Sequence, residues 1–348
     1  MFSKDTVMDI FYSLLAIISA LLVGAVLIEL TGRSAADAYY YLFFGAFGSP
    51  YNFAQTLLKT IPLIFSGLAV AIAFQSGLFN IGGEGQLYWG ALATAVTAIS
   101  LSGLPSIALI PISLGAGAAA GALWAFIPGL LKAKTGAHEV ITTIMFNYIG
   151  ILSTTFLLKK YFKAAGPVDQ SDKIPEAAML PEIIAQTRLT WALIIGIILI
   201  IIIYFFLNNT NLGYDLKAVG ENNYAAEYGG IESSKVIIYA MMLSGAVAGL
   251  TGSTMVMGVL HRFITNFSPG YGFTGIAVAV LGRNKPFGVF LAALLFGVLE
   301  TGSSTMQLFA KIPSDLMVVV QGLVILFVSA PAVYQIINSH LSKIRGGQ

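Results

Sequence analysis

One stretch of the sequence combines residues that could do chemistry with glycines that would let the backbone bend. Residues 77–86 read Gly-Leu-Phe-Asn-Ile-Gly-Gly-Glu-Gly-Gln and separate two long apolar runs. Glycines there allow the backbone to leave helical geometry, and a carboxylate at membrane depth is costly unless protein or water satisfies it. We therefore predict a broken helix that lines a path, with Asn80, Glu84 and Gln86 as its polar groups. The alternative is a tight cytoplasmic turn with a solvated Glu84.

Two other polar residues, Glu139 and Asn147, lie at the start of a further apolar run and within it. Polar groups in membrane helices usually face the interior of the bundle or a cavity. We assign both residues to the same path. For Asn147 the alternative is a hydrogen bond to a neighbouring helix.

Motifs of known enzymatic chemistry are incomplete in this chain. Residues 270–275 match G-x-G-x-x-G but follow no predicted strand, and residues 138–142 begin like H-E-x-x-H but carry threonine where the second ligand belongs. The sequence has no phosphate-binding G-x-x-x-x-G-K-[ST] motif, no cysteine and only 3 histidines. We expect no catalytic residue, no metal, no cofactor and no ATP site on this chain.

The composition indicates which elements must position these groups. The 348 residues are 57% hydrophobic and 10% charged, with a mean hydropathy of +0.84, whereas soluble domains are about 25% charged. A soluble globular protein is thereby excluded. The net charge of +2 gives no electrostatic footprint for nucleic acid.

Apolar runs long enough to cross a bilayer, about 20 residues each, recur along the chain. They predict about ten transmembrane helices in a single membrane domain over residues 1–348. The segment 263–282 begins with turn residues, so we expect a half-helix or re-entrant element there. Two G-x-x-x-G patterns, at 117–121 and 245–249, predict closely packed helix backbones. The runs without acidic or basic residues are Ile10–Ile28, Thr60–Gly83, Gly85–Leu131 (two spans), Val140–Leu158, Leu189–Tyr214, Val236–Leu260, Phe263–Gly282, Pro286–Leu299 (continuing past Glu300 to Ala310) and Leu316–Ser339.

An even number of spans places both termini on one side, and we predict that side to be the cytoplasm. Segment 208–235 is then cytoplasmic and loop 159–189 lies outside. The positive-inside rule does not decide the orientation, because the basic residues divide equally between the two sides. Five of the outer basic residues lie in one loop, namely Lys159, Lys160, Lys163, Lys173 and Arg188.

The run from Asn80 to Gln86 resembles the motif of permease subunits of bacterial ATP-binding-cassette (ABC) importers of the nucleoside and simple-sugar branch, above all nucleoside permeases. Segments 138–145, 220–231 and 270–282 extend the resemblance along nearly the whole chain. Ribose-type permeases share the last two segments in looser form, but typically not the Glu-Gly-Gln tripeptide. That tripeptide favours nucleosides over free sugars.

The resemblance implies an all-α integral membrane protein with a type II ABC importer-like bundle, in the bacterial cytoplasmic (inner) membrane. Residues 220–231 alone predict a short helix that Gly229 and Gly230 terminate, and an ordinary solvated connector is the alternative. By resemblance this segment is the coupling helix that fits a groove on the ATPase. The coupling residues would be Gly220, Glu221, Asn222, Ala225, Ala226 and Gly230.

The partners that the resemblance implies are a cytoplasmic ABC ATPase, a second permease subunit, expected to form a heterodimer, and an extracytoplasmic nucleoside-binding lipoprotein. ATP hydrolysis on the ATPase would open the path to alternate sides. A ribose-like sugar importer permease is the alternative within the class. Outside the class, the alternative is an ion-coupled secondary transporter or channel. The sequence leaves purine or pyrimidine preference open.

Overall fold

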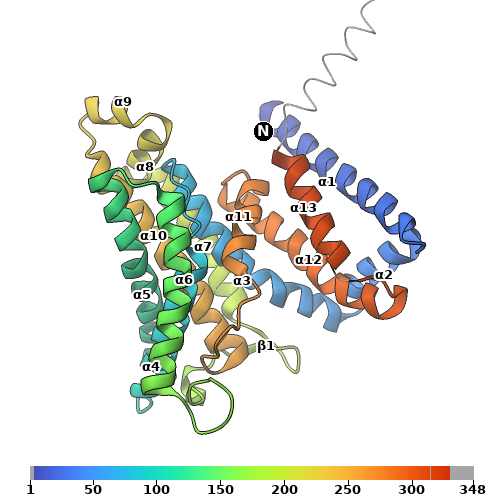
Figure 1. Cartoon of the computed structure of the whole chain (residues 1–348), viewed down its shortest axis with the longest axis horizontal. Helices are drawn as coiled ribbons and strands as arrows, with labels where there is room; N and C mark the ends of the chain where they lie inside the picture. The colour runs from blue at the N-terminus through green and yellow to red at the C-terminus, as the bar shows by residue number, and fades with distance from the viewer. Residues whose placement is uncertain (1–3, 314, 330–348) are drawn as a thin grey trace, which may run out of the picture. The chain divides into compact units, whose positions relative to one another are not determined.

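The chain is almost entirely helical in the computed structural model, which describes residues 4–313 and 315–329 (Figure 1). The described residues form one β-sheet, in which β1 (Glu182–Ile184) pairs antiparallel with β2 (Leu189–Thr190). The α-helices are α1 (Lys4–Leu30), α2 (Ala35–Phe47), α3 (Pro50–Gln75), α4 (Gly83–Ser100), α5 (Ser106–Thr135), α6 (Glu139–Leu157), α7 (Ala192–Asn209), α8 (Asn211–Glu221), α9 (Asn223–Tyr228), α10 (Ser233–Met255), α11 (Tyr271–Leu281), α12 (Pro286–Ala310) and α13 (Asp315–Ser329). Short π-helices extend α6 (Leu158–Phe162) and α10 (Val256–Leu260), and Glu176–Ala178 is a 3-10 turn.

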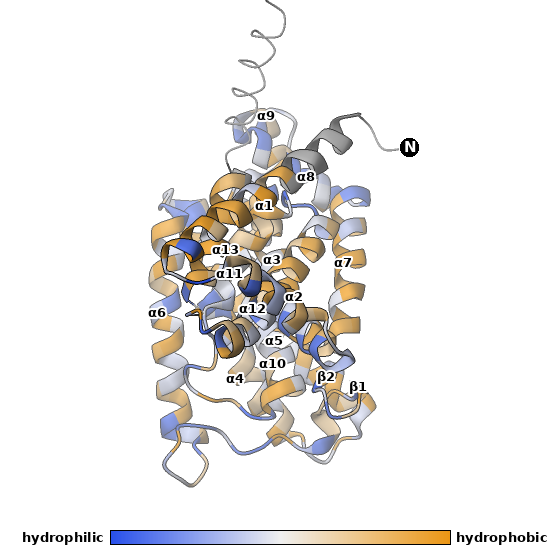
Figure 2. Cartoon of the chain, turned by 90° about the vertical axis from the view of Figure 1, so that its right-hand side faces the viewer, coloured by the Kyte–Doolittle hydropathy of each residue, from blue (hydrophilic) through white to orange (hydrophobic). Residues whose placement is uncertain are grey.

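Every apolar run predicted from the sequence contains a helix. Six helices of the described residues are long and apolar enough to cross a membrane: α3, α5, α6 with its π-helix, α7, α10 with its π-helix, and α12. Figure 2 shows the hydrophobic colour running along α6 and α7. The apolar stretches Leu15–Leu30, Tyr271–Leu281 and Asp315–Phe327 are shorter. A helical protein with several spans is thus confirmed, whereas the number of about ten stays a prediction.

The interruptions between helices follow from local sequence. Gly77 adopts φ +70° after α3 ends at Gln75, and Gly136 adopts φ +68° after α5, a left-handed conformation that glycine adopts without steric cost. The expected half-helix is observed, because residues 263–270 are non-helical and α11 has only 11 residues. The break between residues 77 and 86 is also observed.

The contacts divide the chain into two compact units, and the single domain over residues 1–348 stays a prediction. The first unit combines the segment up to Thr56 with the segment from Val298 onwards. Within it α1 packs on α13, and the Tyr41 ring stacks on Phe309 with centroids 5.3 Å apart. The Tyr39 hydroxyl donates to the carbonyl of Leu21, which ties α2 to α1.

The second unit, Leu57–Gly297, centres on α4, α5 and α10. A Cβ added at Gly90 of α4 would overlap Gly249 of α10, and one at Gly121 of α5 would overlap Gly245. The three backbones therefore touch without intervening side chains. The close approach predicted from the two G-x-x-x-G patterns is confirmed, with Gly90 as an additional member.

Segment 159–189 also belongs to the second unit, where it packs on the residues after α10. The Ser171 amide donates to the Phe263 carbonyl (2.9 Å), and the Phe263 amide donates to the Ser171 hydroxyl (3.0 Å). Asp169 pairs with Lys163 (2.6 Å) and Lys159 (2.9 Å). These two ammonium groups hold the pKa of Asp169 below its usual value.

Candidate functional site

The break between α3 and α4 is held by a pair of buried side-chain amides. The Asn80 Nδ2 donates to the Ser244 hydroxyl of α10 (2.8 Å) and to Gln86 Oε1 (3.0 Å). Asn80 Oδ1 accepts from the Gly82 amide (2.9 Å) and from Gln86 Nε2 (3.1 Å). The structure thus brings Asn80 and Gln86 together and ties the non-helical segment to α10.

Asn147 of α6 joins the same break from another side. Its Oδ1 accepts from the Gly85 amide at 2.7 Å, and its Nδ2 donates to the Ile81 carbonyl at 2.8 Å. The side chain satisfies one group on each side of the start of α4, where helical bonds are missing. Asn147 therefore makes the hydrogen bonds to neighbouring segments that its alternative interpretation described.

Glu84 lies in the first turn of α4 and reaches a second broken helix. Its Oε2 accepts from the Gly272 amide at 2.7 Å, in the first turn of α11, and its carboxylate also bonds Ser268. A carboxylate is favourable at a helix N-terminus because the unpaired amides carry partial positive charge. Because Glu84 is only 3% exposed, the alternative of a solvated carboxylate is wrong.

Ser268 completes this junction between α4 and α11. Its hydroxyl accepts from the Gly270 and Tyr271 amides, each at 3.1 Å, and its amide donates to the Tyr88 hydroxyl at 3.2 Å. Ser268 and Tyr88 were not among the residues predicted from the sequence. Ser268 lies two residues before Gly270, the N-cap of α11, so the preference for serine at the N-cap itself does not point to it.

Glu139 stands apart from this network. Its Oε2 pairs with Lys132 Nζ of α5 at 2.7 Å. Helix α6, which contains Glu139, reaches the break through another residue. The Ile81 amide donates to Thr143 Oγ1 of α6 at 3.3 Å. The sequence did not predict Lys132 as the partner of Glu139. The two residues lie on different helices, α5 and α6, and the turn between them determines whether their side chains meet.

The predicted coupling segment forms two helices rather than one. Gly220 and Glu221 end α8, and Asn222 caps α9 by accepting from the Ala225 amide at 3.0 Å. Helix α9 ends at Gly229, and Gly230 adopts φ +88°, so the predicted glycine stop is confirmed. The segment is helical, and its role as a coupling helix rather than a solvated connector stays a prediction.

The two alanines of α9 differ in exposure. Ala226 is 5% exposed and packs inside this chain, whereas Ala225 is exposed. The exposed face carries two large side chains, Tyr224 at 77% and Tyr228 at 95% exposure. Their i, i+4 spacing places them side by side. Sequence reasoning on small residues missed both tyrosines.

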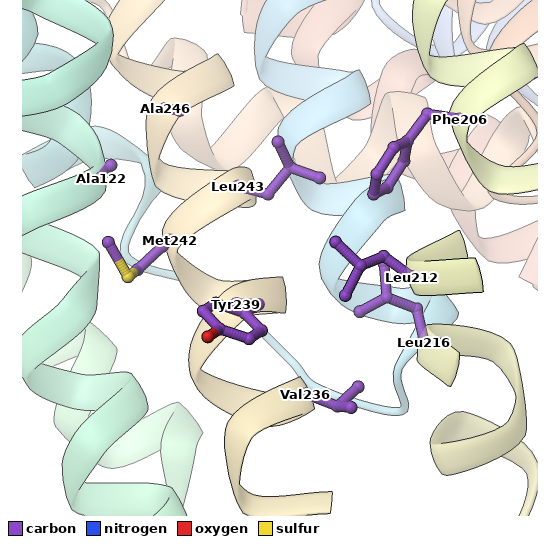
Figure 3. A pocket seen from close by; sticks show the side chains of 9 residues that line it. All are labelled: Ala122, Phe206, Leu212, Leu216, Val236, Tyr239, Met242, Leu243 and Ala246. Carbon is purple, nitrogen blue, oxygen red and sulfur yellow. The ribbon is translucent and has the colours of Figure 1, made fainter. Parts of the chain in front are cut away.

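Beside α8 lies an apolar groove of about 320 Å³ (Figure 3). Side chains of α8 line one side and those of α10 line the other. At the C-terminal end of α8, a Cβ added at Gly220 would overlap the carbonyl of Gln75, the last residue of α3. The groove is lined by Ala122, Phe206, Leu212, Leu216, Val236, Tyr239, Met242, Leu243 and Ala246.

The described residues contain no group of three or more His, Cys, Asp or Glu side chains placed to hold a metal ion. The polar atoms around the break are bonded to one another and to backbone, an arrangement that fixes helices in place. Fold and site together define a helical membrane protein with several spans whose buried polar groups connect broken helices.

Comparison with known proteins identifies the family. Residues 52–329 match the family described as branched-chain amino acid transport system / permease component, and the chain belongs to this permease family. It is 39% identical over 336 residues to the guanosine ABC transporter permease protein NupP of Bacillus subtilis, covering 95% of this chain and 96% of that protein.

Two further relatives are similar over most of their length. The nucleoside ABC transporter permease protein NupB of Lactococcus lactis is 35% identical (96% of this chain, 94% of that protein). The glucose ABC transporter permease protein TsgB13 of Haloferax volcanii is also 35% identical (90% and 85%). No solved structure matches. The resemblance to ABC importer permeases is confirmed, and the chain is a transport component rather than an enzyme.

Proposed function

We propose that this chain is the permease subunit that carries nucleosides across the bacterial cytoplasmic membrane, driven by ATP hydrolysis on a partner subunit. The observation that carries this proposal is the 39% identity to a guanosine permease protein over 95% of the chain. The 35% identity to a glucose permease protein favours a simple sugar as the second candidate.

The break between α3 and α4 forms part of the wall of the translocation path in this proposal. Asn80, Glu84, Gln86 and Asn147 are buried, and their amide and carboxylate groups are bonded within the chain. They therefore act by fixing the shape of the wall instead of binding nucleoside directly. Glu139 contributes to the same path as an ion pair with Lys132.

The ATPase docks on the segment 208–235 in the same proposal, with both chain termini in the cytoplasm. Helix α9 supports this assignment because Tyr224 and Tyr228 are 77% and 95% exposed, and large exposed aromatic side chains are typical anchors of protein interfaces. Gly220, Glu221, Asn222, Ala225 and Gly230 shape the docking surface around them. Ala226 supports α9 from beneath.

The remaining partners are a second permease subunit, different in sequence, and an extracytoplasmic nucleoside-binding lipoprotein. The family supports both, because permeases of this kind act within an ABC importer. Purification of the chain from its native membrane, followed by mass spectrometry, should recover these two proteins and the ATPase. A complex with two copies of this chain and no other permease would contradict the heterodimer.

The decisive experiment is uptake in cells that lack only this protein, with and without the gene restored. Labelled guanosine should enter only the restored cells, and unlabelled uridine and glucose added in excess define the specificity. Uptake of labelled glucose but not of labelled guanosine by the restored cells would replace the proposal with the sugar alternative. The purified chain alone should hydrolyse no ATP. ATP turnover above that of a mock purification would contradict the assignment of ATP hydrolysis to a partner subunit.

A further inference from the structure

The apolar groove beside α8 is built largely on helices that cross the membrane. It has a volume of about 320 Å³ and lies between α8 and α10, with Phe206 of α7 and Ala122 of α5 in its walls (Figure 3). Helices α5, α7 and α10 are each long and apolar enough to span a bilayer. Most of the groove therefore lies at the depth of the lipid hydrocarbon.

The walls of the groove are suited to an apolar occupant. Of the nine lining residues, Tyr239 is the one that carries a hydroxyl, and the others are alanine, valine, leucine, methionine and phenylalanine. A water molecule in a cavity needs two to four polar partners, which these walls do not supply. Hydrocarbon is the chemistry that fits them.

The length of the groove matches one acyl chain. Its wall on α10 runs from Val236 to Ala246, ten residues that rise about 15 Å along the helix axis. The hydrocarbon core of a bilayer is about 30 Å thick, so the groove extends through about one leaflet. The tail of a single bilayer lipid covers the same depth.

Exposed apolar side chains border the groove on two helices. Leu123 follows Ala122 on α5 and is 63% exposed, and Phe205 precedes Phe206 on α7 and is 56% exposed. Side chains of this kind are as apolar as the lipid tails that surround a membrane helix. A lipid tail can therefore enter the groove sideways from the bilayer.

A lysine stands next to the groove on each of its two main walls. Lys217 directly follows Leu216 of α8, and Lys235 directly precedes Val236 of α10. Figure 3 shows Leu216 and Val236 at the same end of the groove, the end where α10 begins. Basic side chains at the end of a membrane-embedded groove attract the headgroups of anionic lipids.

The two lysines differ in how far their charge is offset. Lys235 forms an ion pair with Glu232. The Nζ of Lys217 donates instead to Asn208 Oδ1 at 2.8 Å, which is a neutral partner. Asp215 of the same helix is two positions from Lys217, and side chains at that spacing do not face each other. Lys217 is therefore the better partner for a phosphate group.

We propose that the groove between α8 and α10 binds one acyl chain of an anionic phospholipid from the surrounding bilayer, with the lipid phosphate at Lys217. The site is separate from the polar network at the break between α3 and α4. It depends neither on the transported substrate nor on the ATPase. The bound chain fills an apolar gap between helices that would otherwise lose packing contacts.

Native mass spectrometry of the delipidated full chain tests this proposal with dioleoyl phosphatidylglycerol and dioleoyl phosphatidylcholine, which share their acyl chains. One phosphatidylglycerol should bind about fivefold more tightly than phosphatidylcholine. Ala246→Phe places a ring in the groove and should abolish this binding. Leu123→Phe, on α5 outside the groove, is the control and should leave it unchanged. Lys217→Gln should bind the two lipids equally.

A second measurement identifies the occupant in native membranes. Photoreactive p-benzoylphenylalanine in place of Tyr239 keeps an aromatic side chain at the groove and should cross-link to lipid on illumination. A cross-link to another protein chain would overturn the proposal, because a protein segment would then fill the groove.

The remaining outcomes also decide the proposal. If Ala246→Phe fails to insert, Ala122→Phe fills the groove from α5 instead. Phosphatidylglycerol binding that survives the added ring in an inserted protein would overturn the proposal, as would equal affinity of the unmodified chain for the two lipids. A preference for phosphatidylglycerol that persists in Lys217→Gln would overturn the assignment of the phosphate to Lys217.

Discussion

At the scale of single residues, the buried polar groups act across long sequence separations. Glu84 and Gly272 are 188 positions apart and yet share a 2.7 Å hydrogen bond. The bond satisfies an amide in the first turn of α11 that has no partner within its own helix. A carboxylate that sequence reasoning assigned to a path is thus first of all a link between two broken helices.

This role predicts different effects for two substitutions of Glu84. Glu84→Ala leaves the Gly272 amide buried without an acceptor, at a cost of about 1–3 kcal/mol, so the permease should unfold at lower temperature in detergent and lose uptake. Glu84→Gln keeps a carbonyl acceptor and should retain most of the stability. The midpoint of thermal aggregation measures the difference. Equal, unchanged midpoints for both variants, with uptake lost, would instead indicate direct contact with substrate.

At the scale of elements, glycine determines where helices can approach one another. Gly90, Gly121 and Gly249 let α4, α5 and α10 touch through their backbones, which increases van der Waals contact where no hydrophobic effect drives helices together. Other glycines, such as Gly115 in α5, face open space. The same residue type therefore has opposite effects at different positions of one helix bundle.

A matched pair of alanine substitutions tests this difference. Gly249→Ala forces a methyl group into the backbone of α5 and should destabilise by about 1–3 kcal/mol. Gly115→Ala meets no atom and should stabilise slightly, by up to about 1 kcal/mol, because alanine is the better helix former. Aggregation midpoints that shift in the same direction for both variants would contradict the packing described for α4, α5 and α10.

Helix α9 provides a second test at this scale, of docking. Tyr228→Ala removes a side chain that is 95% exposed, so the free permease should keep its stability. Association with the ATPase should weaken by about 2 kcal/mol or more, the loss typical of an aromatic anchor. Co-purification measures it, and Tyr161→Ala, 61% exposed in the segment 159–189, is the control. Undiminished co-purification of the Tyr228 variant would remove α9 from the docking surface.

Several elements were predictable from sequence because their signals are local. Clustered glycines predicted the break at 77–86, and turn residues followed by a short apolar run predicted the half-helix that became α11. The partners of Glu84, Asn80 and Asn147 were not predictable, because periodicity along one helix says nothing about which other helix faces it. The inward orientation of Ala226 was missed for the same reason.

At the scale of the whole molecule, the distribution of charge becomes clearer with the structure. Lys159 and Lys163 share a single carboxylate, that of Asp169, so their two positive charges are only half offset. The positive-inside rule counts lysine and arginine and gives acidic residues little weight. The placement of segment 159–189 outside therefore stays a prediction.

Thiol labelling in intact cells tests that orientation. An impermeant reagent should label Val168→Cys, which replaces a side chain that is 51% exposed, and should leave Asn223→Cys of α9 unlabelled until the cells are opened. Ser171 is unsuitable as an outer probe because it is fully buried. Labelling at position 223 from outside would contradict both the inward N-terminus and the docking of the ATPase on α9.

The backbone contacts among α4, α5 and α10 have a consequence for how the protein is made. Helices α4 and α5 leave the ribosome more than a hundred residues before α10 is complete, and chains are synthesised at about 5–20 residues per second. For several seconds, Gly90 of α4 and Gly121 of α5 therefore lack the α10 backbone that they contact in the folded protein. The contact among these three helices can form only after α10 has been synthesised.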